Sequence, residues 1–204
     1  MKTTKTVTHN GVFHADDVFA AAVLRSMYPG ISIARTRNPE VIAAADIAFD
    51  VGAEHDPARL RFDHHQRGGA GERPNGVRYA SFGLVWQHYG AELVGGELAA
   101  MVDERLVQAI DAGDCGQAIT VAADGFESVR TMGMSSAISA MNPLWHEFGD
   151  SDDAFDAAVG LAGVMLTRVI AACQGEVLAR DLVRDAVAHG DEIVVLPRFC
   201  PWQK

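Results

Sequence analysis

Residues 6–35 read TVTHNGVFHADDVFAAAVLRSMYPGISIAR, and this stretch decides the fold. The apolar runs at its two ends, residues 6–9 and 31–35, have the composition of buried strands. Between them, residues 16–28 carry Ala, Val and Leu at helical spacing, and a Pro-Gly pair closes that helix. A strand, a helix and a strand in this order predict two parallel strands joined by a right-handed crossover.

The same alternation of strand and helix continues along the chain. Residues 39–45 have a short helical pattern, residues 46–51 are expected to be a third buried strand, and residues 60–62 a fourth. This order is typical of an α/β fold in which helices flank a parallel sheet. We therefore expect residues 1–120 to form an α/β domain.

Helical patterns dominate the second part of the chain. A glycine-rich loop at residues 67–78, expected to be mobile, leads into two amphipathic helices at residues 81–94 and 97–109. Residues 152–189 have apolar positions at three-four spacing, which predicts one long helix or two helices joined near Gly175.

Residues 121–204 as a whole are expected to form a mainly helical second domain. Near its end, residues 191–196 are predicted to be a strand with an exposed apolar edge at residues 193–196. A second copy of the chain could cover such an edge, so the sequence favours a homodimer over a monomer.

The composition is that of a soluble globular protein, with 49% hydrophobic and 22% charged residues among 204. The N-terminus has no apolar signal region, and no stretch is expected to be long enough to span a membrane. Three cysteines, Cys115, Cys173 and Cys200, lie far apart without a CxxC pair. This excludes a disulfide framework or a zinc ribbon and favours a reducing, cytoplasmic location.

The net charge of −10 is unevenly distributed along the chain. Residues 1–78 hold 10 Lys/Arg against 9 Asp/Glu, whereas residues 79–204 hold 7 against 18. Several acids of the first part look like metal ligands, so bound cations would make that part positive. We therefore expect a small anionic substrate there. Tight binding of long nucleic acid needs a large excess of Lys and Arg and is not expected.

Histidine and aspartate residues gather at the predicted strand ends, where open parallel sheets bind ligands. Four segments contribute: His9, His14 and Asp16 from the first strand and its turn, Asp50 near the end of the third, Asp63, His64 and His65 after the fourth, and Asp111 and Asp114 at the end of a helix. Each residue alone has an ordinary interpretation, because a lone Asp often caps a helix and a lone His is often a hydrogen-bonded structural residue. Together they predict a metal site, since two neighbouring imidazoles behind an aspartate have no structural advantage.

The ordinary interpretation is kept for the remaining candidates. His55, His88, His146 and His189 are taken as structural residues, and Cys115 as a small buried side chain. Arg35 and Arg37 either end a strand or contact a phosphate.

Two neighbouring divalent ions need this mixture of ligands, because carboxylates can bridge while imidazoles supply neutral nitrogens. Ligation by His and Asp without thiolates favours Mn²⁺, and Mg²⁺, Co²⁺, Fe²⁺ and Zn²⁺ are also compatible. One such ion lowers the pKa of its bound water to roughly 7, which makes hydroxide available at neutral pH.

Eight motifs also carry a family resemblance that covers essentially the whole chain: residues 8–17, 35–39, 46–52, 62–67, 81–86, 110–114, 141–145 and 200–202. They resemble the melanocyte-proliferating-gene-one (MYG) family, which belongs to, or sits beside, the DHH phosphoesterase superfamily. The resemblance implies a DHH-type N-terminal α/β domain that holds the metal ions and a C-terminal part that closes over it. It also implies metal-dependent hydrolysis of phosphodiester bonds, of the exonuclease type.

The resemblance assigns roles to individual residues. It implies that His9, His14 and Asp50 hold one ion, that Asp16, Asp50, His64 and Asp111 hold the other, and that Asp50 bridges them. Asp114 is a candidate additional ligand. Of the expected catalytic residues His65, Asp63 and Arg67, His65 would contact the phosphate or donate a proton, and Asp63 would orient a neighbouring imidazole. Arg35, Arg37 and Asn10 are the expected substrate-binding residues.

Two features depart from the resemblance. Residues 135–141 contain no arginine where family members carry some, and the chain ends at Lys204, soon after the Cys-Pro-Trp motif. The helical second part is therefore expected to be shortened.

The expected function is a two-metal phosphoesterase that acts on nucleotides or short oligonucleotides. Two alternatives are a binuclear hydrolase of a non-phosphate bond such as an amide, and an inactive metal-binding module. Should long strands bind tightly instead, their groove would have to be built from Arg35, Arg37, Arg67, Arg73 and Arg78.

Overall fold

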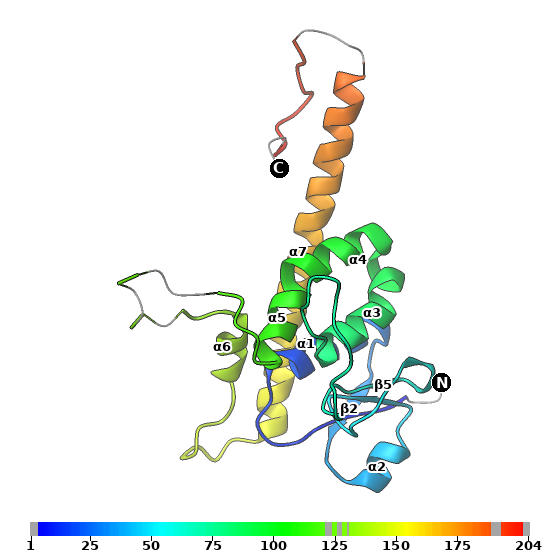
Figure 1. Ribbon diagram of the computed structural model, residues 1–204, viewed down its shortest axis with the longest axis vertical. Coiled ribbons are helices and arrows are strands. Elements are labelled where there is room, and N and C mark those ends of the chain that lie inside the picture. The colour runs from blue at the N-terminus through cyan, green and yellow to red at the C-terminus, as the bar shows by residue number, and fades with distance from the viewer. Residues whose placement is uncertain (1–3, 121–123, 126–127, 130, 189–192, 202–204) are drawn as a thin grey trace.

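The computed structural model describes residues 4–120, 124–125, 128–129, 131–188 and 193–201. Its first part is built on a five-stranded sheet (Figure 1). In their order across the sheet, the strands are β2 (Ser32–Arg35), β1 (Lys5–Thr8), β3 (Ile47–Phe49), β5 (Arg61–Phe62) and β4 (His55–Asp56). The first four are parallel, and short helices and loops connect them. The α/β fold class is thereby confirmed.

One strand departs from the predicted parallel sheet. β4 pairs antiparallel with β5, with His55 opposite Phe62 and Asp56 opposite Arg61. The reversal occurs in a short 3₁₀ turn, Pro57–Arg59, followed by Leu60 in the left-handed region at φ 55°. A two-residue polar strand has no apolar run by which the sequence could indicate it.

The two faces of the sheet are covered unequally. On one face lie α1 (Ala15–Met27) and α3 (Ser81–Val94), whose Phe19 and Phe82 rings are 5.2 Å apart between centroids. On the other face the short helix α2 (Pro39–Ala43) packs Ile42 against a small cluster of Val7, Ala45, Ala48 and Val51. The main hydrophobic core therefore lies on the side of α1 and α3.

The helices of the second part extend this core. α4 (Gly96–Val102), a π-helical turn (Asp103–Val107) and α5 (Gln108–Asp114) follow one another directly, so the helix predicted at residues 97–109 continues to Asp114. After α6 (Met134–Ser139) comes α7 (Ser151–Val187), one helix that passes Gly175 without a break. Residues of α7 from Phe155 to Cys173 share one hydrophobic core with α1 and α3.

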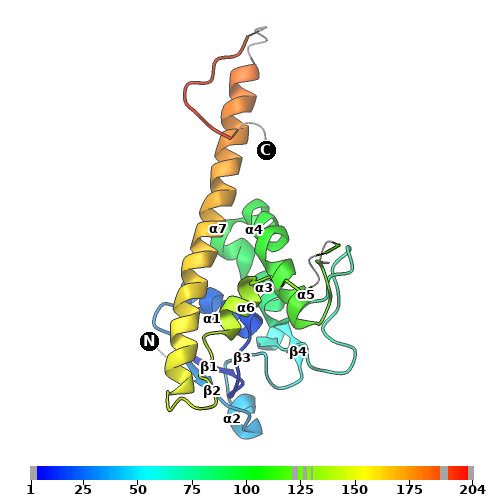
Figure 2. The ribbon, with the colours of Figure 1, turned by 90° about the vertical axis from the view of Figure 1, so that its left-hand side faces the viewer.

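One expectation about the end of the chain is wrong. Residues 193–196 form no strand, while Asp191 and Glu192 lie outside the described residues. A strand needs a partner, and these residues follow the outer end of α7, far from the sheet (Figures 1 and 2). The homodimer argument based on a strand edge there therefore loses its basis.

The expectation about membrane-spanning length is also wrong. By length and composition alone, α7 is long and apolar enough to cross a membrane, although 28% of its most apolar stretch is buried within the protein. Core helices of soluble proteins have the same property. The inner part of α7 contributes to the main hydrophobic core.

Candidate metal centre

The first turn of α1 and the loop before it supply four side chains to the centre. His14 caps the helix, and its backbone N–H donates a hydrogen bond of 2.9 Å to Asp17 Oδ1. Asp16 and Asp17 are fully buried in the first turn, where the positive end of the helix dipole stabilises carboxylates. The other Asp17 oxygen, Oδ2, lies 3.2 Å from His9 Nε2. This turn thus places two buried carboxylates beside two imidazoles.

Asp50 lies between two imidazoles from different segments. Its Oδ2 is 3.1 Å from His9 Nε2, and its Oδ1 is 3.3 Å from His64 Nε2. Asp50 follows β3 in the left-handed region at φ 53°, a conformation that Asp and Asn adopt more readily than other residues with a side chain. The Ser81 hydroxyl at the start of α3 donates to Asp50 Oδ1 at 3.0 Å. A carboxylate that offers one oxygen to each side is arranged to bridge two cations.

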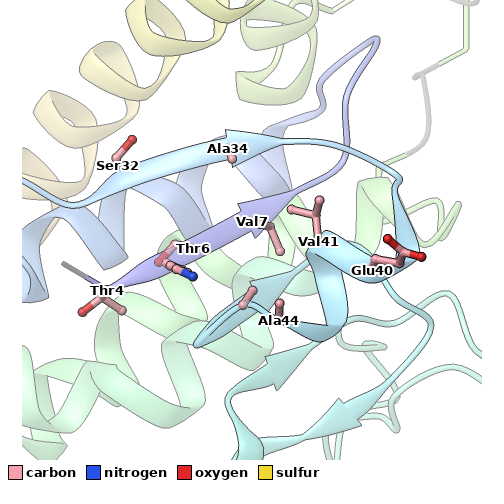
Figure 3. A pocket seen from close by; sticks show the side chains of 10 residues that line it. Thr4, Thr6, Val7, Ser32, Ala34, Glu40, Val41 and Ala44 are labelled. Carbon is pink, nitrogen blue, oxygen red and sulfur yellow. The ribbon is translucent and has the colours of Figure 1, made fainter. Parts of the chain in front are cut away.

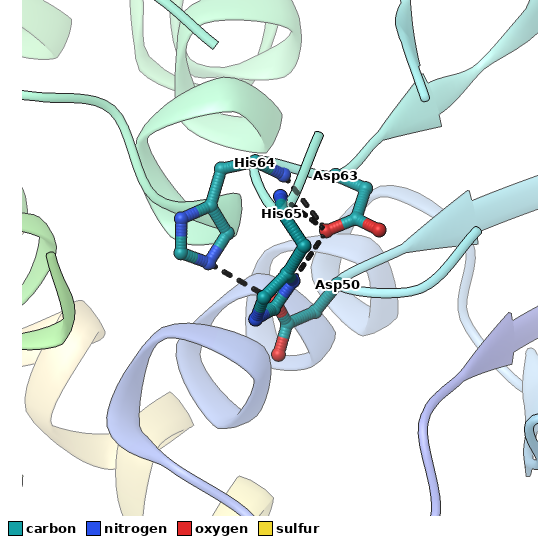
Figure 4. A group of neighbouring side chains, drawn as sticks. All are labelled: Asp50, Asp63, His64 and His65. Atoms are coloured by element: carbon teal, nitrogen blue, oxygen red, sulfur yellow. Dashed lines mark hydrogen bonds and ion pairs between the residues drawn. The ribbon is translucent and has the colours of Figure 1, made fainter. Parts of the chain in front are cut away.

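Asp63 fixes the two histidines that follow it (Figure 4). Its Oδ1 accepts from the backbone N–H of His64 at 2.8 Å, from that of His65 at 3.2 Å, and lies 2.7 Å from His65 Nδ1. Its Oδ2 accepts from the Ala53 N–H at 2.6 Å. The His64 side chain is 10% exposed and the His65 side chain 58%. His64 therefore belongs to the buried cluster, while His65 faces the opening.

Asp114, at the end of α5, completes the centre. Its Oδ2 lies 3.1 Å from His64 Nε2, and its Oδ1 lies 3.8 Å from His14 Nδ1. Three groups each have all their donor atoms within 4.8 Å of one another: His9, Asp17 and Asp50; His14, Asp16 and Asp114; and Asp50, Asp63, His64 and His65. The structure thus brings together residues from four distant segments of the sequence.

The carboxylates of the centre repel one another electrostatically. Burial raises the pKa of Asp16 well above its ordinary value, and the negative charges of Asp50 and Asp114 add to this effect. Burial alone would also raise the pKa of Asp50, but hydrogen bonds from His64 and His9 lower it instead. The cluster therefore needs positive charge to keep its carboxylates ionised.

In the absence of a cation, protons on the imidazoles provide that positive charge. Burial alone would lower the pKa of His9, but hydrogen bonds to Asp17 and Asp50 raise it to about 10. The pKa of His64 likewise rises to about 12 against the effect of burial, because Asp114 and Asp50 accept hydrogen bonds from it. A bound cation would take over the role of these protons.

The donor set fits a divalent metal ion. Asp16 Oδ1 is buried without a hydrogen-bond donor in the described part of the chain, and the partner of Asp17 Oδ2 is the His9 imidazole, 3.2 Å away. Buried carboxylate oxygens without donors are costly unless a cation coordinates them. Carboxylate and imidazole ligands without a thiolate suit Mn²⁺, Mg²⁺ and related ions.

A cavity of about 480 Å³ opens onto the centre. His9, His14, Asp50 and His65 line it together with Arg37. The Arg37 guanidinium donates to Asn10 Oδ1 at 2.9 Å and also to the Asn10 backbone carbonyl. Arg37 and Asn10, both expected to bind substrate, are therefore held together at the rim.

Asp111, by contrast, lies outside the three groups. Its Oδ2 is 2.9 Å from a guanidinium nitrogen of Arg73, and its Oδ1 accepts from the Gly83 N–H at 2.9 Å. Burial raises the pKa of Asp111 to about 7, and the Arg73 charge opposes this rise. A buried arginine is the partner of this carboxylate, and the role of Asp111 as a metal ligand stays a prediction.

Two arginines expected at a substrate surface are also buried. The Arg35 side chain is 1% exposed and donates to the Ser151 carbonyl at 3.0 Å and to Asp152 at 2.9 Å, so it anchors the start of α7. Arg73 pairs with Asp103 at 2.6 Å and with Asp111, which ties the glycine-rich loop to the helices. These ion pairs hold both side chains inside the protein, and Arg73 attaches the loop at residues 67–78, which was expected to be mobile, to the helices.

The other arginines of the predicted surface remain accessible. Arg67 is exposed in the turn after His65, and Arg78 is exposed near the end of the glycine-rich loop. Among the described contacts, none joins Arg67 to the metal cluster. Its catalytic role stays a prediction.

Sequence reasoning missed four residues of the centre. Asp17 and Ser81 contact the cluster directly, and Cys115 Sγ lies 3.9 Å from His64 Nδ1. Asn142 holds the loop between His9 and His14, because its side-chain amide bonds both the N–H and the C=O of Phe13 at 2.9 Å. The adjacent pair Asp16-Asp17 is a signal that could have revealed Asp17, whereas the other three contacts depend on tertiary structure.

A second cavity of about 480 Å³ lies away from the centre, between α2 and the exposed face of β1 and β2 (Figure 3). Thr6, Ser32, Ala34, Val41 and Ala44 are among the residues that line it. It shares no residue with the three groups that could hold a metal ion. We therefore do not assign it to the same site.

Fold and centre together define an α/β protein with a buried cluster of aspartates and histidines at the carboxyl ends of its strands. The chain belongs to the family described as an uncharacterised protein family (UPF0160), whose MYG1 exonuclease profile matches residues 5–204. It is 35% identical to human MYG1 exonuclease over 97% of this chain and 60% of that protein. It is 33% identical to a MYG1 protein of Saccharomyces cerevisiae over 97% of this chain and 67% of that protein.

The relatives are longer than this chain, which spans about 60% of the human protein's length. The bovine MYG1 exonuclease is similar to the same degree, with 34% identity. No solved structure matches the chain.

Proposed function

We propose that this chain is a metal-dependent phosphodiesterase that removes nucleotides from short oligonucleotides. The observation that carries the proposal is the position of Asp50, which offers one oxygen to His9 and the other to His64. The exonuclease names of the similar mammalian proteins support the choice of a phosphodiester as the bond that is cleaved.

The residues of the centre divide into two ligand sets that share Asp50. His9 and Asp17 would complete one set, and His64 with Asp16 and Asp114 the other. We propose Mn²⁺ as the ion, because nitrogen and oxygen ligands occur here without a thiolate. Divalent ions in such pairs activate water for attack on phosphorus and neutralise the charge that develops on the phosphoryl oxygens.

His65 is placed to act as the proton donor. Its Nδ1 is bonded to Asp63, while its exposed side chain faces the cavity. The hydrogen bond to Asp63 raises the pKa of His65 above its ordinary value, which favours the protonated imidazole. A protonated imidazole can donate to the leaving oxygen as the phosphodiester bond breaks.

Arg37 would hold the phosphate group. It is the arginine that lines the cavity, and its bonds to Asn10 fix its guanidinium at the rim. A guanidinium suits a phosphate, because it presents several N–H donors in one plane.

The experiment is a side-by-side assay of a nitrophenyl phosphodiester, a dinucleotide and a strand of about 30 nucleotides with added Mn²⁺. We expect hydrolysis of the two small substrates, and weaker, salt-sensitive action on the long strand, because residues 79–204 carry 18 acidic residues against 7 basic ones.

Asp50→Asn should abolish hydrolysis, whereas Asp156→Asn, an exposed carboxylate on α7, is the matched control and should not. Absence of phosphodiester cleavage by the Mn²⁺-loaded wild type would contradict the proposal. Processive degradation of the long strand would contradict its preference for short substrates.

A further inference from the structure

A separate cavity of about 490 Å³ adjoins the metal centre on the side of α6. It lies between the first turn of α1, the end of α5 and the helix α6. His14 and Asp114 form its wall toward the centre, Ile110 gives it an apolar side, and Ser135, Ser136 and Ser139 face it from α6. Three hydroxyl groups thus lie together beside the proposed ligands.

His14 lines both this cavity and the one that opens onto Asp50 and His65. The two spaces therefore meet at one side chain. A molecule whose phosphate lies in the first cavity can place the group attached to that phosphate in the second.

The charges of the two cavities differ. Arg37 lines the cavity over the metal centre, so that cavity can receive a phosphate. Among the residues that line the cavity beside α6, there is no Lys or Arg, and Asp114 contributes a carboxylate. A further phosphate would be repelled there, whereas a neutral group with hydroxyls could bond the serines and pack against Ile110.

The position of α6 relative to the centre is fixed. The Asn142 side chain, just after α6, donates to the Ser139 carbonyl at 3.2 Å while it holds the Phe13 backbone. Ser135 lies against Gly113, because a Cβ atom on that glycine would be 3.5 Å from the Ser135 hydroxyl. These contacts place the serines beside the loop that carries His9 and His14.

We infer that the cavity lined by Ser135, Ser136 and Ser139 is the nucleoside subsite, and that it takes the sugar of the terminal nucleotide through its hydroxyl groups. This inference rests on the proposed function, because the metal centre is where the attached phosphate would bind. It names a substrate with one phosphate at the centre and a neutral nucleoside beside it.

The test is a calorimetric titration of the Mn²⁺-loaded protein with a ribonucleoside monophosphate and, separately, with inorganic phosphate. We expect the nucleotide to bind about tenfold more tightly than phosphate, the scale of one or two additional hydrogen bonds. In the triple variant Ser135→Ala, Ser136→Ala, Ser139→Ala, the nucleotide should bind no more tightly than phosphate, and phosphate binding should stay unchanged. These serines are exposed, so their replacement leaves the core intact.

Ser32→Ala is the matched control, since this exposed serine lines the cavity beside α2 instead. It should keep the tenfold preference for the nucleotide. Equal affinity of the wild type for nucleotide and phosphate would overturn the inference, as would a triple variant that retains the preference. Because binding is measured without turnover, a failure to hydrolyse phosphodiesters would count against the proposed function alone.

Discussion

Charged side chains are buried in the metal centre but exposed on the outer part of the helix α7. In the centre, Asp16, Asp17 and Asp50 are buried beside imidazoles. On the outer part of α7, Arg184 and Asp185 are largely exposed, and their ion pairs among the described residues are with side chains of the same helix. Burying charge is expensive, and exposed pairs contribute little. This contrast supports the proposal that the buried charges serve metal binding, because buried charges are a poor way to stabilise a fold.

The two regions also differ in how far their apolar side chains are buried. Phe19, Phe49 and Phe62 are fully buried next to the centre, whereas Val164 and Leu178 of α7 are about 60% exposed. Substitutions around the centre should therefore disturb many contacts at once, and substitutions on the outer face of α7 should disturb few.

Replacing a glycine should have opposite effects in the two regions. A Cβ atom on Gly83 would lie 1.8 Å from Asp111 Oδ2 and 2.8 Å from an Arg73 nitrogen. Gly83→Ala must therefore displace a buried ion pair, and we expect the free energy of unfolding to fall by about 3–5 kcal/mol.

Gly175→Ala is the matched control on α7, where a Cβ atom would meet nothing within 4 Å. It should raise the free energy of unfolding by about 0.5–1 kcal/mol, because alanine favours a helix interior. Urea denaturation of the two variants measures both values. Equal effects of the two substitutions would remove the contrast between the regions.

His65→Ala should reduce turnover of a small phosphodiester by about 10²-fold, the usual scale for an acid–base group. Metal content should not change, because the exposed His65 is bonded through Nδ1 to Asp63 and is not among the proposed ligands. The control is His146→Ala, an exposed histidine that contacts the Trp145 ring. Initial rates and elemental analysis of the same samples separate the two properties. A loss of bound metal in His65→Ala would make this residue a ligand instead.

Metal affinity should rise with pH. The pKa of His9 is raised to about 10 and that of His64 to about 12. Both imidazoles are therefore in the positively charged form, with both ring nitrogens protonated, at neutral pH in the metal-free protein. A metal ion must displace each proton from the nitrogen that it binds. Between pH 6 and 8, the association constant for Mn²⁺ should therefore increase about tenfold per pH unit for each proton released. Calorimetry in two buffers of different ionisation enthalpy counts the protons, and pH-independent binding would contradict this assignment.

Asn142→Asp should lower the affinity for Mn²⁺ about tenfold, the lower end of the range for residues that support metal ligands. The variant keeps the oxygen that accepts from the Phe13 N–H but loses the donor to the Phe13 carbonyl. Asn75→Asp, in the glycine-rich loop, is the control and should bind Mn²⁺ like the wild type. An unchanged affinity in Asn142→Asp would mean that Phe13 is held well enough by its own burial.

The sequence predicted the parts of the fold that depend on local pattern. Strands β1, β2 and β3 and helices α1 and α3 have apolar runs at the correct period, and all five form near the predicted residues. β4 was not predicted, because two polar residues form a strand only where a neighbouring strand, here β5, pairs with them. The reverse error occurred at residues 193–196, whose apolar run predicts a strand that finds no neighbour.

The residues of the centre that directly follow strands could be predicted from the sequence. His9, Asp50 and the Asp63–His65 motif follow strands that end at one edge of the sheet, so chain order alone brings them together. Asp111 shows the limit of this reasoning, because only the tertiary structure reveals that its carboxylate forms an ion pair with Arg73. Arg35 and Arg73 look like phosphate contacts in the sequence, yet each is buried by packing that no local pattern records.

The central claim is that Asp50 joins two metal-binding sets, and the metal content of purified protein after incubation with Mn²⁺ tests it most directly. The wild type should retain about two ions per chain. Asp50→Asn should retain neither tightly, while its circular dichroism stays unchanged because Asn tolerates the left-handed conformation at this position. Wild-type protein without bound Mn²⁺, or an Asp50→Asn variant with the wild-type metal content, would contradict the claim.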